Sequence, residues 1–315
     1  MHHVGHIDWS FIERPAPASA TSSGLARVLL VGPEQGATHT DLAAVGLLPG
    51  GWLAPHVHSF EEAIYVLDGE LLVTIGDTVH RLASGDYALY PTGVRHALGN
   101  TSDAAVRLLS LASPQRLAPD AGRKDTFFEP FQPVRDLAAM DAAARRPPFG
   151  DPTLRLVGHY EGTGPQLETL RIKDAARGRA SAGRDTALVV YSGISVKMLV
   201  DHQFGADHVT MFTVDYEVGG AAQAHDHPFE EVYVFLAGEV EGEIDGQHYT
   251  FGPGDVAFAG VGSVHGFYNT GTERVRWIET QAPQPPARHS YRWVQDWERY
   301  EQEHQTRPPG EENRQ

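Results

Sequence analysis

Two segments of the chain carry histidine and glutamate at a spacing that suits metal coordination. The first, from residue 55, reads PHVHSFEEAIYVLDGE, and the second, from residue 224, reads AHDHPFEEVYVFLAGE. In each segment two histidines stand two residues apart, and a glutamate follows the second histidine by four residues. Beyond each segment, a third histidine comes 38 residues after the second. The two sets are His56, His58, Glu62 and His96, and His225, His227, Glu231 and His265.

Binding to a cation is the simplest way to bury such a set. Side chains at positions i and i+2 of a β-strand share a face, so the paired histidines point the same way, and the glutamate has the same parity. If that face is the inside of a closed barrel, two imidazoles and a carboxylate would be costly to bury unpaired. A divalent cation with ligand distances near about 2.1 Å satisfies all of these groups.

The chemistry of the donors narrows the choice of metal. Three neutral imidazoles and one carboxylate form a nitrogen and oxygen site that suits Mn, Fe, Co, Ni, Cu or Zn better than Ca or Mg. An octahedral ion with four protein ligands keeps two positions open for substrate, water or O2. We therefore expect up to two divalent transition-metal ions per chain, and we favour Fe or Mn over Ni, Co, Cu and Zn.

The two sets belong to an internal repeat. A constant offset of 169 residues relates the four residues of one set to those of the other. It also relates Gly69 to Gly238, Gly85 to Gly254, Gly93 to Gly262 and Asn100 to Asn269, without a gap. Chance does not supply eight such pairs in register. The chain therefore contains two copies of one domain, formed by duplication.

Each copy has the texture of a β-protein. Runs of Val, Ile, Leu, Tyr and Phe alternate with Gly and Asp turn signals, as in AIYVLDGELLVTIGDTVHRLASGDYALYPTG of the first copy. This spacing predicts an all-β fold of two small barrels or sandwiches. Helical patterning is strongest at residues 136–146, between the copies, and at residues 291–305, near the end.

The same pattern sets domain boundaries. We predict an N-terminal arm over residues 1–23, a first barrel over 24–115, a linker and wrapping segment over 116–189, a second barrel over 190–283, and a C-terminal helix with a disordered tail over 284–315. His2, His3 and His6 lie in the arm and are expected to be surface residues. Glu61 and Glu230 precede the motif glutamates, have the opposite strand parity and are expected to be solvated.

Composition excludes several classes of function. The chain has 315 residues, 41% of them hydrophobic, which is enough for two domains with buried cores. Its 25 basic and 41 acidic residues give a net charge of −16, so we expect no nucleic-acid and no membrane partner. The absence of cysteine removes disulfides, thiolate ligands and cysteine nucleophiles. With no segment like a signal peptide, we expect a cytoplasmic protein.

The motifs resemble those of the cupin superfamily. GGWLAPHVHSFEEAIYVLDG and GDYALYPTGVRHALGN match the first and second cupin motifs, and GGAAQAHDHPFEEVYVFLAG and GDVAFAGVGSVHGFYN match them again. Gly260 stands where the second motif usually has proline, which concerns a turn and not a ligand. The chain is therefore identified as a bicupin. The resemblance implies two tandem double-stranded β-helix (jelly-roll) barrels, with metal held in each by the set given above.

Strand parity also predicts how the two cavities differ. The predicted lining residues are Ile64, Val66 and Leu98 in the first copy and Tyr233, Phe235 and Phe267 in the second. The first cavity should therefore be aliphatic and the second aromatic, with a phenol that can donate or relay a proton. The alternative is that Tyr233 and Phe235 only fill the core. The candidate catalytic residues are Glu62, Glu231 and Tyr233.

The fold alone does not fix the reaction. We favour an enzyme, a dioxygenase with quercetinase-like chemistry on a small planar enol, phenol or diketone-type substrate. One alternative is a metal-dependent hydrolase or deaminase similar to ureidoglycine aminohydrolase, and another is a protein that binds a small metabolite without turnover. Bicupin oxalate decarboxylases hold oxalate by an arginine whose positions here are Leu53 and Ala222, which argues against oxalate. The resemblance also makes a homodimer an expectation.

Overall fold

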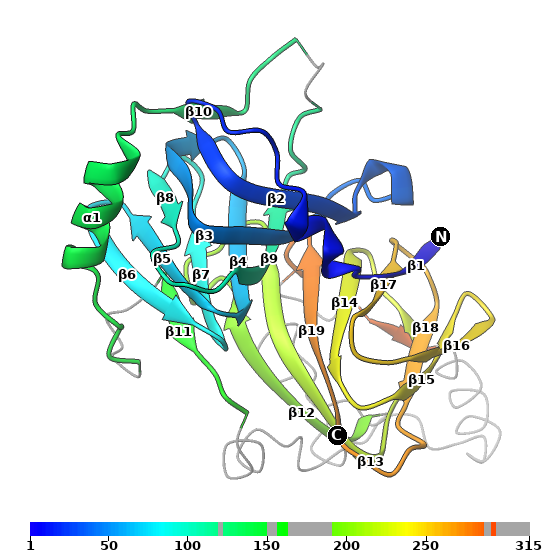
Figure 1. Ribbon diagram of the computed structural model, residues 1–315. Coiled ribbons are helices and arrows are strands. Elements are labelled where there is room, and N and C mark those ends of the chain that lie inside the picture. The colour runs from blue at the N-terminus through cyan, green and yellow to red at the C-terminus, as the bar shows by residue number, and fades with distance from the viewer. Residues whose placement is uncertain (119–121, 150–155, 163–190, 287–290, 294–315) are drawn as a thin grey trace, which may run out of the picture.

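The computed structural model describes residues 1–118, 122–149, 156–162, 191–286 and 291–293. Within these residues the chain forms two curled β-sheets, one for each copy of the repeat, which lie against each other (Figure 1). Helical segments in the same part of the chain are short: α1 (Pro133–Ala143), η1 (Trp9–Glu13) and η2 (Pro33–Gln35). The architecture confirms the predicted all-β fold and is that of two tandem jelly-roll barrels.

The first barrel is a sheet of ten strands in the described residues. They are β2 (Ser22–Val31), β3 (Asp41–His58), β4 (Glu61–Asp68), β5 (Glu70–Ile75), β6 (Thr78–Ala83), β7 (Asp86–Tyr90), β8 (His96–Gly99), β9 (Val106–Ser113), β10 (Thr126–Phe128) and β11 (Val157–His159). The hydrogen-bonded order is β11-β7-β4-β9-β3-β8-β5-β6, and β2 and β10 also pair with β3. The long strand β3 thus carries the first two histidines at its end.

The second barrel, over the part of the chain that is described, repeats this plan. Its strands are β1 (His2–His6), β12 (Tyr191–Val200), β13 (Thr210–Asp226), β14 (Glu230–Ala237), β15 (Val240–Ile244), β16 (Gln247–Phe251), β17 (Asp255–Ala259), β18 (His265–Tyr268), β19 (Val275–Ala282) and β20 (Arg292–Trp293). Their order is β1-β17-β14-β19-β13-β18-β15-β16, with β12 and β20 also on β13. Each strand of one barrel has a counterpart at the same place in the other, as the duplication predicts.

The barrels exchange their N-terminal strands. β1, which begins the chain, pairs with β17 of the second barrel, and β11, which precedes the second copy, pairs with β7 of the first (Figure 1). Nδ1 of His6 lies 2.8 Å from Asp255 Oδ1, and Nδ1 of His159 lies 2.5 Å from Asp86 Oδ1, so the same contact closes both exchanges. The N-terminal arm is therefore an ordered strand. Its sequence signal is Val-Gly-His at 4–6, which recurs at 157–159 outside the 169-residue register.

A shared apolar core joins the two barrels. Along β3, Leu42 and Ala44 belong to this shared core, whereas Ala43 and Val45 belong to the interior of the first barrel. Both faces of the central strands are thus buried, which explains their nearly continuous apolar runs. Other large side chains of the shared core are Leu109, Leu111, Met211, Val232, Phe258 and Ile278.

The two predicted helices have different outcomes. The helix expected at 136–146 exists as α1, which begins earlier because Pro133 fits its first turn, and which packs Met140 against Trp52 of the first barrel. The prediction of a helix from residue 291 is wrong at the start of that segment. Arg292 and Trp293 instead form the strand β20, which pairs with β13 at His225. The rest of that segment lies outside the described residues.

Glu61 and Glu230 are buried, so the prediction that they are solvated is wrong. Their side chains point away from their own barrel, as parity requires, but that side faces the other barrel. Glu61 accepts hydrogen bonds from the backbone N–H groups of residues 207–209 in the second barrel. Glu230 accepts them from the backbone N–H groups of residues 38–40 in the first. Each copy therefore caps a loop of the other with a buried carboxylate.

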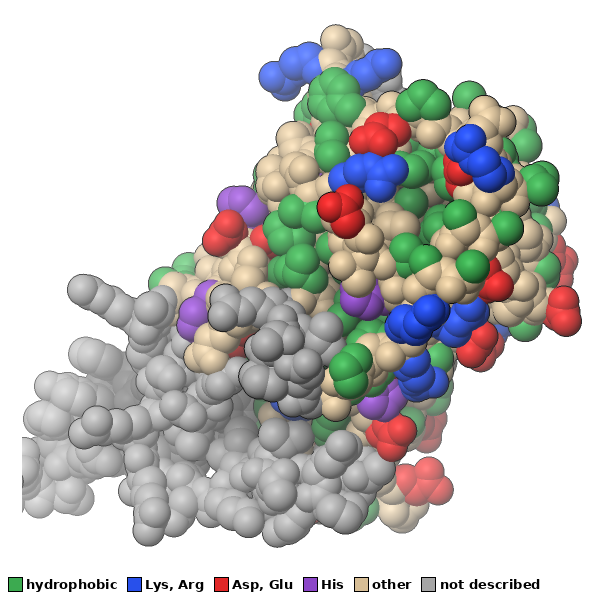
Figure 2. All heavy atoms as spheres, turned by 90° about the vertical axis from the view of Figure 1, so that its left-hand side faces the viewer, with side chains coloured by type: hydrophobic (Ala, Val, Ile, Leu, Met, Phe, Trp, Pro, Cys, Tyr) green, Lys and Arg blue, Asp and Glu red, His purple; other side chains and the backbone are tan. Residues whose placement is uncertain are grey.

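The face drawn in Figure 2 shows Lys and Arg side chains interspersed with Asp and Glu. Among the described residues of that face, this mixture of charges forms no extended basic surface for a phosphate backbone. Among the described helices, none has the length and apolar character that crossing a bilayer requires.

We expect Glu230→Gln to lower the free energy of unfolding by about 2 kcal/mol, because the amide replaces one acceptor oxygen by a donor that faces backbone N–H groups. Urea unfolding followed by circular dichroism measures the change. Glu239→Gln, at an exposed carboxylate of the same barrel, should change it by less than about 0.5 kcal/mol. Equal midpoints for the two variants would show that the capping contact does not stabilise the pair of barrels.

Candidate metal centres

The first set of histidines and glutamate converges inside the first barrel. His56 and His58 end β3, His96 begins β8 and pairs in register with His56, and Glu62 lies on β4. One nitrogen atom from each histidine lies within 4.8 Å of the others, and all three side chains are buried. The fold thus brings together residues that are 40 positions apart in the chain.

Backbone carbonyls fix the orientation of these imidazoles. Nδ1 of His56, His58 and His96 lies 2.8, 2.5 and 2.9 Å from the carbonyl oxygens of Ala54, Phe60 and Val94. Because a carbonyl oxygen only accepts, each Nδ1 carries the proton and each Nε2 presents a lone pair to the centre. Nε2 of His58 and Nε2 of His96 are buried without a hydrogen-bond partner, which is the arrangement that a metal ion satisfies.

Glu62 completes the first set with one oxygen and is held by the other. Its Oε2 lies 3.3 Å from Nε2 of His58 and 3.8 Å from Nε2 of His96. Its Oε1 accepts hydrogen bonds from Oγ of Ser110 and from Nη2 of Arg116, both at 2.5 Å. Burial raises the pKa of Glu62, but Arg116 and the two histidines outweigh burial and hold that pKa well below its usual value. The group is therefore a carboxylate at neutral pH.

The second set repeats this geometry with different supports. The Nδ1 atoms of His225, His227 and His265 lie 2.7, 2.9 and 2.9 Å from the carbonyl oxygens of Gln223, Phe229 and Ser263. Oε2 of Glu231 lies 2.9 Å from Nε2 of His227 and 3.2 Å from Nε2 of His265. Oε1 of Glu231 accepts a hydrogen bond of 2.6 Å from Gln281, and the Tyr233 hydroxyl donates to Oε2.

Burial keeps the imidazoles in the form that binds metal. Burial and the neighbouring His96 lower the pKa of His56 to about 4, and burial and His265 lower the pKa of His225 well below its usual value. Both rings are therefore neutral at neutral pH. Three imidazoles whose Nε2 atoms converge, together with one carboxylate, fit a divalent transition-metal ion in each barrel.

The first set opens onto a cavity of about 220 Å³. The lining combines apolar side chains with the metal-binding set, two arginines, a serine and a threonine. The lining residues are Leu25, Arg27, Val45, Leu53, His56, His58, Phe60, Glu62, Ile64, Tyr90, His96, Leu98, Leu108, Ser110, Arg116, Thr126 and Phe128. Phe128 comes from β10, which pairs with the end of β3 and lies across the mouth of the barrel.

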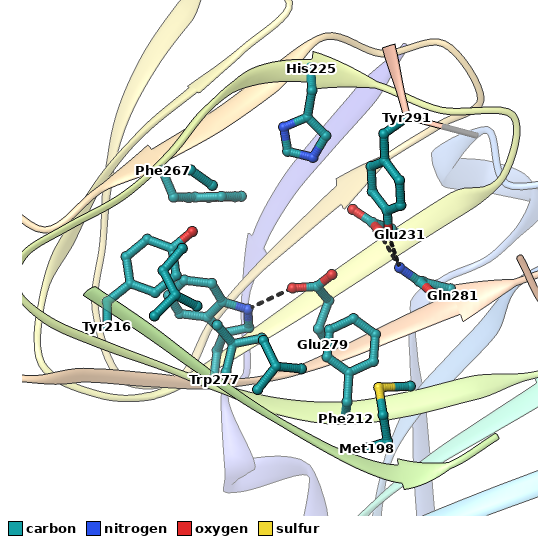
Figure 3. A pocket seen from close by; sticks show the side chains of 14 residues that line it. Met198, Phe212, Tyr216, His225, Glu231, Phe267, Trp277, Glu279, Gln281 and Tyr291 are labelled. Carbon is teal, nitrogen blue, oxygen red and sulfur yellow. Dashed lines mark hydrogen bonds between the residues drawn. The ribbon is translucent and has the colours of Figure 1, made fainter. Parts of the chain in front are cut away.

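The second cavity is smaller, at about 80 Å³. Figure 3 shows the carboxyl group of Glu279 and the ring of Tyr291 pointing into the same space as His225. Nε1 of Trp277 donates to Oε2 of Glu279 at 3.0 Å. Burial, with a further contribution from Glu231, raises the pKa of Glu279 well above its usual value.

Strand parity predicted some of the lining and missed the rest. Ile64, Leu98 and Phe267 line the cavities as expected. Val66 and Phe235 are not among the lining residues, and both side chains are fully buried in the barrel cores. Tyr233 is also in that core, where its hydroxyl contacts Glu231.

Several polar groups of the two sites were missed by sequence reasoning. Ser110 and Gln281 contact the motif glutamates from β9 and β19, strands that carry no cupin motif, and their inward parity was the available signal. Arg116 and Tyr291 come from segments after those strands. Nothing in their local sequence indicates that the chain returns to the site.

Comparison of the sequence with protein families matches the cupin domain family to residues 44–112 and to residues 212–280. Each matched segment contains one complete set of three histidines and a glutamate. The chain is a bicupin. Two barrels of the cupin superfamily follow one another in this bicupin, and each contains a histidine triad that could hold a metal ion.

Known proteins resemble this bicupin in sequence or in fold. It is 30% identical over 122 residues to the tetracenomycin polyketide synthase protein TcmJ of Streptomyces glaucescens, covering 38% of the bicupin and 78% of the relative. It is 30% identical over 101 residues to the polyketide synthase CurC of Streptomyces cyaneus, covering 32% and 66%.

Solved structures share the fold at lower sequence identity. A variant of salicylate 1,2-dioxygenase from Pseudoaminobacter salicylatoxidans, in complex with gentisate, superposes with a TM-score of 0.65 at 16% identity, over 90% of the bicupin and 82% of that chain. Oxalate decarboxylase from Lactobacillus farciminis superposes with a TM-score of 0.57 at 18% identity, over 97% and 96%. These likenesses establish the architecture.

We expect the purified bicupin to contain two transition-metal ions per chain, since both donor sets are complete. His58→Ala and His227→Ala should each remove one ion per chain, and the double variant should remove both, as measured by inductively coupled plasma mass spectrometry. His248→Ala, at an exposed histidine outside both sets, is the control and should retain two. Unchanged metal content in the double variant would show that the ions bind elsewhere.

Proposed function

We propose that this bicupin is a metal-dependent oxygenase that acts on a small planar enol, phenol or diketone-type molecule in its first barrel. The observation that carries the proposal is the placement of the His56, His58, His96 and Glu62 donors at the wall of a cavity of about 220 Å³. A substrate oxygen atom in that cavity can lie beside the point on which the donors converge. A site with this opening can take part in a reaction, unlike a closed structural site.

A metal ion and the side chains around it would contribute differently to a reaction in the first cavity. A divalent transition-metal ion bound there, with Fe or Mn favoured, would supply a Lewis-acidic and redox-active centre at which an enolate or phenolate can react with O2. The protein contributes the geometry. Ser110 and Arg116 hold Oε1 of Glu62, which leaves Oε2 directed at the histidines. Among the described lining residues Glu62 is the carboxylate of the first cavity, and we propose it as the proton acceptor for the substrate hydroxyl.

Cavity size favours the first barrel over the second. An apolar cavity of about 150 Å³ in another protein, T4 lysozyme, is large enough to bind benzene. The first cavity exceeds that volume at about 220 Å³, whereas the second falls below it at about 80 Å³. In the second barrel the Tyr233 hydroxyl is already bound to Glu231. We therefore assign Glu231 and Tyr233 to holding a metal ion rather than to turnover.

The known proteins support this substrate class. The superposed salicylate dioxygenase holds gentisate, a small planar phenol. Both sequence relatives are named as polyketide synthase proteins. Polyketide chains alternate carbonyl and methylene carbons, and such 1,3-diketone units enolise readily. Enols, phenols and diketones therefore form the panel on which the proposal should be tested.

Oxygen consumption by metal-loaded protein tests the proposal. We expect uptake with at least one member of a panel of enols, catechols and β-diketones, measured with an oxygen electrode. His96→Ala should lower the rate at least 100-fold, because it removes a ligand of the working site. The matched variant His265→Ala in the second barrel should keep the rate within about threefold.

Other results would select another function. No uptake with any compound, together with ammonia release from ureido or amidino compounds, would indicate a hydrolase or deaminase. Ligand affinity without either reaction would indicate a binding protein. If His265→Ala lost O2 uptake and His96→Ala kept it, the reaction would belong to the second barrel.

A further inference from the structure

The first cavity is lined by two arginines, and the described lining of the second contains no cationic side chain. Arg27 comes from β2 and Arg116 from the segment that follows β9. Both side chains are largely buried at the wall of the cavity, with 33% and 20% of their surface exposed. Guanidinium groups at such a depth need anionic partners.

Within the described residues Arg27 contacts one carboxylate, that of Asp41, which it shares with Arg116. Nη2 of Arg27 and Nη1 of Arg116 both donate to the same oxygen of Asp41, the latter at 2.7 Å. Nη2 of Arg116 also donates to Glu62, which the metal ion would share. Burial and repulsion by Arg116 lower the pKa of Arg27, as expected for a cation that lacks full compensation. One Asp41 oxygen is the partner of Arg27 within the described residues.

The duplication provides an internal comparison. Arg27 faces Val45 across the β2–β3 ladder, and Val196, 169 residues later, faces Val214 across β12–β13. The same offset places Thr210 at the position of Asp41, Glu279 at that of Ser110 and Pro285 at that of Arg116. The second barrel thus keeps the metal-binding set and lacks the whole charged cluster. The complete set of metal-binding donors therefore occurs in this chain both with the charged cluster and without it.

We propose that the first cavity binds an organic anion, a carboxylate or enolate on an apolar planar body, and that Arg27 is its cationic anchor. The guanidinium group has five N–H donors in a planar fork, of which the described structure uses one in Arg27. The apolar body would contact the remaining wall, which includes Leu25, Leu53, Leu98 and Phe128. This substrate class deepens the proposed function and uses the same cavity.

The proposal also corrects a sequence-based expectation. The absence of arginine at Leu53 and Ala222 argues against oxalate, but it concerns only the strands that carry the paired histidines. In the structure the cations arrive from β2 and from beyond β9. An acid with an apolar body fits this lining better than oxalate, which has no apolar surface to bury.

Paired ligands of equal shape and different charge test the anchor. Salicylate is an anion at neutral pH, and salicylamide is a neutral analogue. Calorimetric titration of the metal-loaded protein should give salicylate at least a tenfold lower Kd than salicylamide. Arg27→Val, which introduces the side chain found at this position in the second barrel, should weaken salicylate binding about 10- to 100-fold. It should leave the salicylamide Kd within about threefold and the metal content unchanged.

Two further variants separate anchoring from general damage. Arg27→Lys keeps the charge without the fork and should retain part of the preference for salicylate. Arg95→Val removes an exposed arginine that pairs with Glu129 outside the cavity, and it should behave like the natural protein. Equal affinity for the two ligands, undetectable salicylate binding, or loss of metal in Arg27→Val would overturn the proposal. The calorimetric experiment measures binding and not turnover. If salicylate binds through Arg27 but the separate oxygen-electrode assay finds no O2 uptake, only the oxygenase proposal fails.

Discussion

Hydrogen bonds from imidazole Nδ1 atoms to nearby backbone carbonyls determine how both centres are built. Each of the six motif histidines makes such a contact, and five of the six distances lie between 2.7 and 2.9 Å. The contact fixes the tautomer and directs a lone pair into the barrel. Three lone pairs and a carboxylate gathered away from water are unfavourable unless a cation lies among them. The barrel therefore holds these donors in an arrangement that a bound cation would stabilise.

The two copies show which features the metal set requires and which are additions. Both keep the three histidines, the glutamate and a carboxylate that caps the other barrel. Both also keep an asparagine, Asn100 or Asn269, whose side-chain amide donates to a backbone carbonyl. They differ in what surrounds the set. The first copy has a cavity of about 220 Å³ with two arginines, and the second has a cavity of about 80 Å³ with the buried Glu279. This divergence is the basis for proposing that both barrels hold a metal ion and that substrate binds in the first.

Sequence reasoning reached the features that depend on local spacing. The repeat, the all-β fold and the two converging donor sets follow from motif spacing and strand parity. Strand parity is informative because side chains alternate between the two faces of a β-strand with a period of two residues. Sequence reasoning failed where a side chain meets a distant segment. Glu61 was expected in water because parity shows only that it points outward, not that the other barrel lies there. Arg27 and Arg116 reach the cavity through tertiary structure that no local pattern records.

X-ray absorption spectroscopy of the manganese- or iron-loaded protein tests the central claim most directly. The account predicts a first shell that includes three imidazole nitrogens and one carboxylate oxygen near about 2.1 Å, with the multiple scattering typical of histidine rings. It also predicts the same shell when either barrel alone is loaded, in variants that lack the other set. A shell made only of oxygen atoms, without imidazole scattering, would contradict the account.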